Sequence, residues 1–95
     1  MFNMKVEFVV YILHSKKFNK YYTGFTSNLI ERFKSHNYLS KKGSTIKYRP
    51  WMVVYVEFYY SKPEAMKREK YLKSGKGREW LKSTLASEGS YPPQA

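Results

Sequence analysis

The strongest constraint on the fold is a pair of strand-like segments near the start of the chain, joined by a polar turn. Residues 6–13 form an apolar run rich in β-branched and aromatic side chains, which predicts a strand covered on both faces. Residues 14–20 are polar and predict a hairpin connection, and residues 21–23 predict the returning strand. Gly24 either ends this second strand or permits a close approach to it. An antiparallel pair of strands, each carrying a tyrosine, is therefore expected at the centre of the fold.

A helix is expected directly after the second strand. Asn28 is placed to accept amide protons at the start of this helix. Leu29 and Phe33 form an apolar pair one turn apart, and Arg32 and His36 form a second pair beside it. The second pair is therefore expected to project from the edge of the buried face towards the sheet.

The second half of the chain predicts a long loop, a third strand and two more helices. The loop spans residues 38–51, and loops of this length in a compact domain are more often functional than accidental. Residues 52–59 predict the third strand. Ser61 is the expected cap of a helix that ends at Gly75, the predicted left-handed terminating residue. A short helix over residues 78–85 completes the series.

Length and composition narrow the class of protein. The 95 residues allow one domain, placed at residues 1–88, with a disordered tail at 89–95. The order β-β-α-β-α-α predicts an α+β fold, a small three-stranded antiparallel sheet with helices packed on it. With no cysteine, a disulfide framework and a thiolate zinc site are excluded. No apolar run approaches the ~20 residues that cross a bilayer, so we expect a cytoplasmic protein without membrane contact.

The second predicted helix carries an acid where its apolar stripe should be. Ala65, Met66 and Leu72 define the inward stripe, and Glu69 falls within it at helical spacing. Burying a carboxylate is costly unless a charge or a metal ion compensates it. Glu69 is therefore expected either to pair with a buried arginine or to bind a cation.

The net charge points to a polyanionic partner. The formal charge is +11, and all seven acids are glutamates. Such an excess costs self-repulsion that a nucleic acid would relieve, although a solvated basic surface is the simplest alternative. Basic residues near aromatic ones suit contacts with a nucleic-acid backbone and stacking on bases. The expected nucleic-acid contacts are Lys41, Lys42, Lys47, Arg49, Lys73 and Lys76.

Five further side chains form a set suited to phosphodiester hydrolysis. A single carboxylate can hold a divalent ion that keeps most of its waters, as magnesium prefers, and the ion polarises a phosphate oxygen. An arginine offers planar donors that match phosphate oxygens. A phenol or an imidazole orients or deprotonates the attacking water. The candidate catalytic residues are Tyr11, Tyr22, Arg32, His36 and Glu69.

The arrangement of these residues resembles the GIY-YIG nuclease family. The two short signatures of that family appear in degenerate form at residues 10–12 and 22–24. Val10 stands in place of the first glycine, and Thr23 stands in place of the isoleucine. The similarity covers about residues 6–86 and is closest to the small stand-alone bacterial members.

The resemblance implies roles for three of the candidates. The helix arginine of the family matches Arg32, a histidine often found one turn later matches His36, and the metal-binding glutamate matches Glu69. It implies a DNA endonuclease that depends on Mg²⁺ or Mn²⁺. Since no recognition module is appended, little sequence preference is expected. The implied setting is structure-directed DNA repair or recombination in a bacterial cytoplasm, associated with the nucleoid when DNA is bound.

Two other classes of function remain open from the sequence. A non-catalytic nucleic-acid-binding domain could use the same basic surface, although no RNP signature, GxxG clamp or zinc pattern indicates a named binding module. A protein-interaction adaptor descended from a nuclease is the other, and the sequence names no protein partner. Dependence on metal separates the enzyme from the binder, because a binder has no reason to keep Glu69 in an inward stripe.

Overall fold

The computed structural model describes residues 7–41, 43 and 45–87. Its elements are strands β1 (Phe8–Ser15) and β2 (Lys20–Thr26), helix α1 (Leu29–Lys34), the π-helical turn η1 (Ser35–Leu39), the 3₁₀ turn η2 (Ile46–Tyr48), strand β3 (Met52–Tyr59), and helices α2 (Lys62–Lys73) and α3 (Gly75–Ser87). The strands form one antiparallel sheet with the order β2-β1-β3. The predicted α+β fold and its β-β-α-β-α-α order are confirmed.

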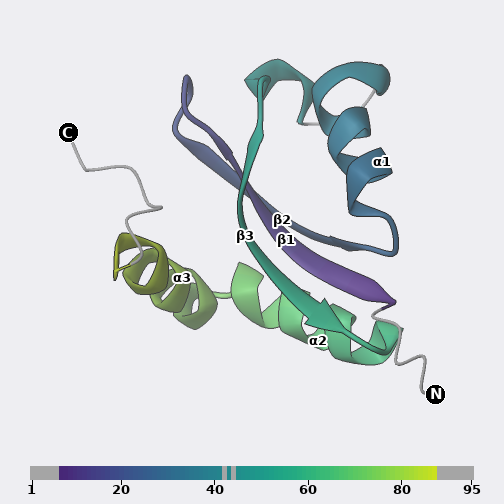
Figure 1. Cartoon of the computed structure of the whole chain (residues 1–95). Helices are drawn as coiled ribbons and strands as arrows, with labels where there is room; N and C mark the ends of the chain where they lie inside the picture. Colours follow the sequence, from purple (N-terminus) through teal and green to yellow (C-terminus); the bar gives the residue numbers. More distant parts are fainter. Residues whose placement is uncertain (1–6, 42, 44, 88–95) are drawn as a thin grey trace.

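The sheet is covered on both faces, as Figure 1 shows, with α1 on one side and α2 and α3 on the other. The central strand β1 alternates between these two layers. Val10 and Ile12 pack towards α2 and α3, whereas Tyr11 and Leu13 pack with Trp51 on the α1 side. The apolar run of β1 is therefore continuous because both of its faces are buried.

Local signals fix the helix starts where the sequence predicts them. The Asn28 side chain accepts a hydrogen bond from the Glu31 amide at 3.1 Å, and the Ser61 hydroxyl accepts one from the amide three residues on. Leu29 and Phe33 pack against the buried cluster on the α1 side. Both predicted caps and the predicted apolar face of α1 are therefore present.

The C-terminal helices differ from the prediction. Gly75 opens α3 rather than closing α2 in a left-handed conformation, because Ser74 takes an extended backbone and its hydroxyl accepts from the Gly77 amide at 3.2 Å. Met66, predicted to face inward, is 47% exposed, and Trp80 on α3 is 37% exposed. Ala65 and Leu72 are fully buried. Helix α2 therefore packs through these two residues, and Met66 is turned towards solvent. The predicted tail at 89–95 lies outside the described residues.

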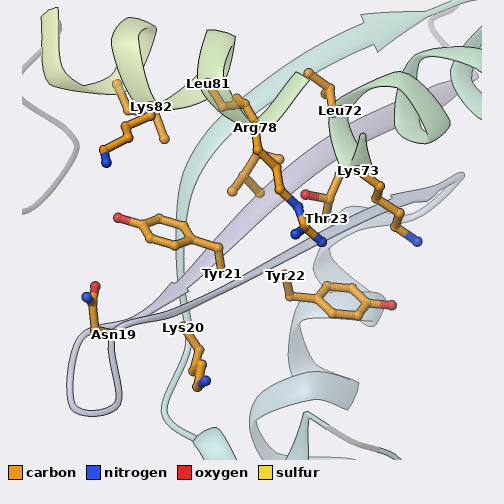
Figure 2. Close-up of a pocket in the computed structure, with 12 residues that line it drawn as sticks. Asn19, Lys20, Tyr21, Tyr22, Thr23, Leu72, Lys73, Arg78, Leu81 and Lys82 are labelled. Atoms are coloured by element: carbon orange, nitrogen blue, oxygen red, sulfur yellow. The ribbon is translucent and has the colours of Figure 1, made fainter. Parts of the chain in front are cut away.

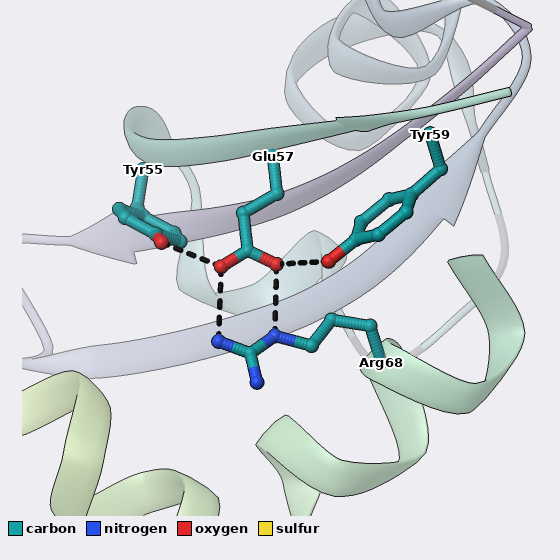
Figure 3. A network of polar contacts seen from close by, with 4 residues as sticks. All are labelled: Tyr55, Glu57, Tyr59 and Arg68. Carbon is teal, nitrogen blue, oxygen red and sulfur yellow. Dashed lines mark hydrogen bonds and ion pairs between the residues drawn. The ribbon is translucent and has the colours of Figure 1, made fainter. Parts of the chain in front are cut away.

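The carboxylate that pairs with an arginine is the partly buried one of Glu57, between β3 and α2, rather than that of Glu69 (Figure 3). Two donors of Arg68 reach its oxygens at 2.9 and 3.1 Å, and the hydroxyls of Tyr55 and Tyr59 donate at 2.6 and 2.7 Å. Burial opposes ionisation, but these hydrogen bonds outweigh it and lower the pKa of Glu57. The Arg68 guanidinium also lies 4.7 Å from the Trp80 ring centroid. This network fastens α2 to the sheet.

Candidate active site

A pocket of about 240 Å³ lies on the α1 side of the sheet. Strand β2 contributes Tyr22, helix α1 contributes Arg32 and the π-helical turn contributes His36. The loop after η1 closes the pocket with Gly43 and Thr45. The structure therefore brings three of the five predicted catalytic side chains to one pocket, from three consecutive elements.

Tyr11 lies directly behind this pocket. Its hydroxyl is 2.9 Å from Nε2 of His36, and its ring centroid is 6.2 Å from that of Tyr22. The rings of Tyr22 and His36 are closer still, with centroids 4.7 Å apart. Tyr11 is only 1% exposed and does not line the pocket. It lies behind Tyr22 and His36, which do line it.

His36 is held as a neutral imidazole. Burial lowers the pKa of His36, and the positive charges of Arg32 and Arg49 lower it further. The second ring nitrogen, Nδ1, is 3.0 Å from the hydroxyl of Thr45. Sequence reasoning missed Thr45, because a single threonine in a long loop carries no signal of its contact.

Tyr11 is held as a neutral phenol. Burial raises its pKa, as do the nearby Tyr22 and the negative charge of Glu69, while Arg32 acts in the opposite direction. In the tautomer of neutral His36 with its proton on Nδ1, the Tyr11 hydroxyl donates to Nε2 and the Nδ1–H donates to Thr45. Burial and charge set the protonation states, and this tautomer gives the hydrogen-bond chain its direction.

Arg49 holds the π-helical turn in place. Its guanidinium donates to the backbone carbonyls of Ser35 and Ser40 at 2.9 and 2.8 Å, and its Nε donates to the carbonyl of His36. The Asn37 side chain adds two hydrogen bonds to the backbone of Trp51. The nucleic-acid contact predicted for Arg49 stays a prediction, but its donors already bind backbone carbonyls within and directly after the π-helical turn.

Glu69 lies on α2 and is the remaining predicted catalytic residue. Its side chain is 21% exposed, and it pairs with Lys73 at 3.3 Å rather than with an arginine. Its charge nevertheless reaches Tyr11, whose pKa it raises. The described residues contain no group of three or more His, Cys, Asp or Glu side chains that could enclose a metal ion. The role of Glu69 as a metal ligand stays a prediction.

The other predicted nucleic-acid contacts are lysines. Lys41, Lys47 and Lys76 are exposed, and Lys42 lies outside the described residues. Lys73 is half exposed beside Glu69. Their contacts with nucleic acid stay predictions. Over the described ranges, no helix has the length and apolar character needed to span a bilayer.

Comparison with known proteins places these features in a family. The sequence model of the GIY-YIG catalytic domain matches residues 7–82. The chain is 40% identical over 73 residues to the UPF0213 protein SH2523 of Staphylococcus haemolyticus, covering 77% of this chain and 88% of the relative. It is 44% identical over 68 residues to the UPF0213 protein CPE1444 of Clostridium perfringens, covering 67% and 68%. No solved structure gives a significant match.

Proposed function

This chain belongs to the GIY-YIG family of nuclease domains, and we propose that it is a DNA endonuclease that depends on a divalent metal ion. The observation that carries the proposal is the pocket in which Arg32 and a neutral His36 meet Tyr22. A cation for the phosphate and an acceptor for a proton are the two groups that hydrolysis of a phosphodiester requires.

Arg32 is the phosphate-binding group of this proposal. It is exposed on α1 at the wall of the pocket, so a backbone phosphate can approach it without a change in the fold. Its planar guanidinium matches two phosphate oxygens at once. Its charge counts most in the transition state, where negative charge on the phosphoryl oxygens is greatest.

The two tyrosines and His36 form the proton path. Tyr22 lies at the pocket surface beside Tyr11, with ring centroids 6.2 Å apart, and Tyr11 in turn donates to His36. In the proposed step the attacking water gives a proton to the Tyr22 oxygen. The Tyr22 proton moves to Tyr11, and the Tyr11 proton moves to Nε2 of His36. Thr45 then accepts from the Nδ1–H of the resulting imidazolium.

Glu69 is the residue that would hold Mg²⁺ or Mn²⁺. Such an ion, when bound, polarises a phosphate oxygen and offsets the charge on the leaving alkoxide. The neutral phenol of Tyr11, whose pKa Glu69 raises, leaves this carboxylate as the main negative charge that the site offers to a cation.

The proposed substrate is DNA, cut with little sequence preference. No element of the described fold other than the basic surface is available to read base edges, so selection by DNA structure is the expected mode. Structure-directed repair or recombination is the corresponding biological setting. We place the catalytic domain at residues 1–88 and expect it to act in the bacterial cytoplasm, on the nucleoid.

The test is a cleavage assay on end-labelled branched, nicked and continuous duplex DNA, with Mg²⁺, with Mn²⁺ and with a chelator. We expect cleavage with metal only, and none from Arg32→Ala prepared in parallel, which excludes a contaminating nuclease. Lys67→Ala, an exposed change outside the pocket, should cut normally. Binding of all three DNAs without cleavage under any condition would leave the non-catalytic binder as the correct class.

A further inference from the structure

A larger pocket, of about 570 Å³, lies on the opposite face of β2 from the candidate active site (Figure 2). Strand β2 and helices α2 and α3 line it, and none of the functions proposed above uses it. Its floor is apolar, formed by Ile12, Leu72, Leu81 and Leu85. The ring of Tyr21 forms part of its wall.

The rim of this pocket is cationic. Lys20, Lys73, Arg78 and Lys82 line it, and no acidic residue does. In Figure 2 the side chain of Arg78 extends from α3 towards Thr23 and Tyr22 of β2. Among the described residues, neither Arg78 nor Lys82 has an acidic partner within ion-pair distance. Both charges are therefore available to a bound anion.

Size and chemistry together select the occupant. The volume lies within the range of about 300–1,000 Å³ that small-ligand sites span. An apolar floor with an aromatic wall suits a flat ring, and a rim of guanidinium and ammonium groups suits a phosphate beside it. A nucleotide unit combines these two parts.

The two pockets meet at one residue. Tyr22 lines both of them, and it lies on β2, which forms an edge of the sheet. A nucleic-acid strand that passes over this edge can therefore contact both pockets at once. We propose that the larger pocket binds one unpaired nucleotide of the DNA strand, next to the phosphate that occupies the active site. This assignment rests on the proposed nuclease function.

A pocket that holds a single base favours DNA in which that base is unpaired. A base held between β2 and α3 cannot remain paired with the opposite strand. Extracting a base from a continuous duplex costs free energy, and the cost is least where the base is already unpaired. The protein should therefore act preferentially at flaps, bulges or junctions with single strands.

The test measures binding without metal and without cleavage. Labelled single-stranded pentanucleotides, each with one base replaced by an abasic sugar, are titrated with the full-length protein and followed by fluorescence anisotropy. All of these probes carry the same phosphates, so any difference reports on a base. We expect one position at which loss of the base weakens binding by about tenfold, as for a stacked base.

Two variants connect that position to the pocket. Tyr21→Leu keeps an apolar side chain in the wall but removes the aromatic ring, and Arg78→Glu repels the phosphate at the rim without touching the core. Either change should reduce the penalty for the missing base to less than about threefold. Lys67→Glu makes the same charge change outside both pockets and should keep the full penalty.

Equal affinity for all abasic probes, or a penalty that persists in both pocket variants, would overturn the proposal. Failure of the nuclease function gives a different result, in which the base-specific penalty is present but DNA is not cut when metal is added. The reverse pattern is metal-dependent cleavage without a base-specific penalty. It would refute nucleotide binding in this pocket and support the nuclease function.

Discussion

The phenol oxygen of Tyr11 lies over Gly24, where a β-carbon on residue 24 would be 2.6 Å from it. The register of the sheet sets these two residues opposite each other on β1 and β2. Tyr11 can move aside only by giving up its contact with His36, since its ring is buried and its hydroxyl lies against that imidazole. Of the two roles open to Gly24 from the sequence, ending the strand or permitting a close approach, the structure shows the second.

Gly24→Ala should therefore lower both the stability of the fold and the cleavage activity. The added methyl group displaces the Tyr11 ring and breaks its hydrogen bond to His36, at a cost of about 1–3 kcal/mol in the free energy of unfolding. Cleavage should fall by at least about tenfold. Denaturant unfolding and the cleavage assay measure the two effects. Gly75→Ala is the control, because its β-carbon would meet nothing within 4 Å. A Gly24→Ala protein with normal activity would show that Tyr11 is not in the proton path.

Arg32→Ala should lower the turnover rate far more than the affinity for DNA. We expect a loss in kcat of about 10²–10³-fold, with a much smaller change in KM, because the guanidinium acts mainly on the transition state. Arg32→Lys should recover little, since an ammonium lacks the planar pair of donors. Lys34→Ala removes a neighbouring exposed charge and should leave kcat unchanged. Equal losses in both alanine variants would reduce Arg32 to a general electrostatic role.

Glu57→Gln should destabilise the fold without any metal present. The change leaves the Arg68 guanidinium without its charged partner against β3. We expect a loss of about 2 kcal/mol or more in the free energy of unfolding, below the 3–5 kcal/mol of a fully buried pair because both side chains keep some contact with water. Glu64→Gln, at an exposed helix start, is the matched control and should cost less than about 1 kcal/mol. Similar losses in the two variants would mean that the Glu57–Arg68 network does not fasten α2.

The stability of the protein should fall as the pH drops below about 6.5. The pKa of His36 lies below its ordinary value of 6.5, so the unfolded chain takes up a proton in this range that the folded protein does not. The slope from this residue is at most about 1.4 kcal/mol per pH unit and vanishes once the pH is well above 6.5. The free energy of unfolding in urea, measured between pH 5 and 7.5 for the wild type and for His36→Gln, gives the contribution of His36 as the difference between the two curves. Glu57 acts in a separate window, since its lowered pKa removes stability only as the pH falls below 4.5. Parallel pH curves for the two proteins would contradict the assignment.

The parts of this molecule that the sequence predicts are those set by neighbours along the chain. The hairpin of β1 and β2, the caps at Asn28 and Ser61, and the pairing of Arg32 with His36 all depend on residues a few positions apart. The meeting of Tyr22 with this pair follows from the chain order of β2 and α1.

What the sequence does not predict depends on contacts between distant elements. Glu57 sits in an apolar strand without a periodic signal, and its partner Arg68 is on a helix whose rotation is set by the close packing of Ala65. The sequence therefore gives no sign of the pair between Glu57 and Arg68. Thr45 and Arg49 act on His36 only after the loop has folded back onto η1.

Glu69, the residue that would hold the metal ion, should be needed for cleavage but not for folding. Glu69→Gln keeps the size of the side chain and removes its charge, so it should abolish metal-dependent cleavage. Because Glu69 pairs with a half-exposed Lys73, the free energy of unfolding without metal should change by less than about 1 kcal/mol. Affinity for DNA should hold or rise, since one negative charge near the phosphates has gone.

Three measurements on the same preparation decide the role of Glu69: cleavage with Mg²⁺ or Mn²⁺, anisotropy binding without metal, and thermal unfolding without metal. Glu79→Gln, an exposed change on α3, is the control for the loss of one acid and should retain cleavage. A stable Glu69→Gln protein that binds DNA but does not cut it assigns the carboxylate to the metal, since neither folding nor binding accounts for the loss. A variant that still cuts at the wild-type rate would remove Glu69 from the catalytic set, and the metal would then need ligands other than this carboxylate.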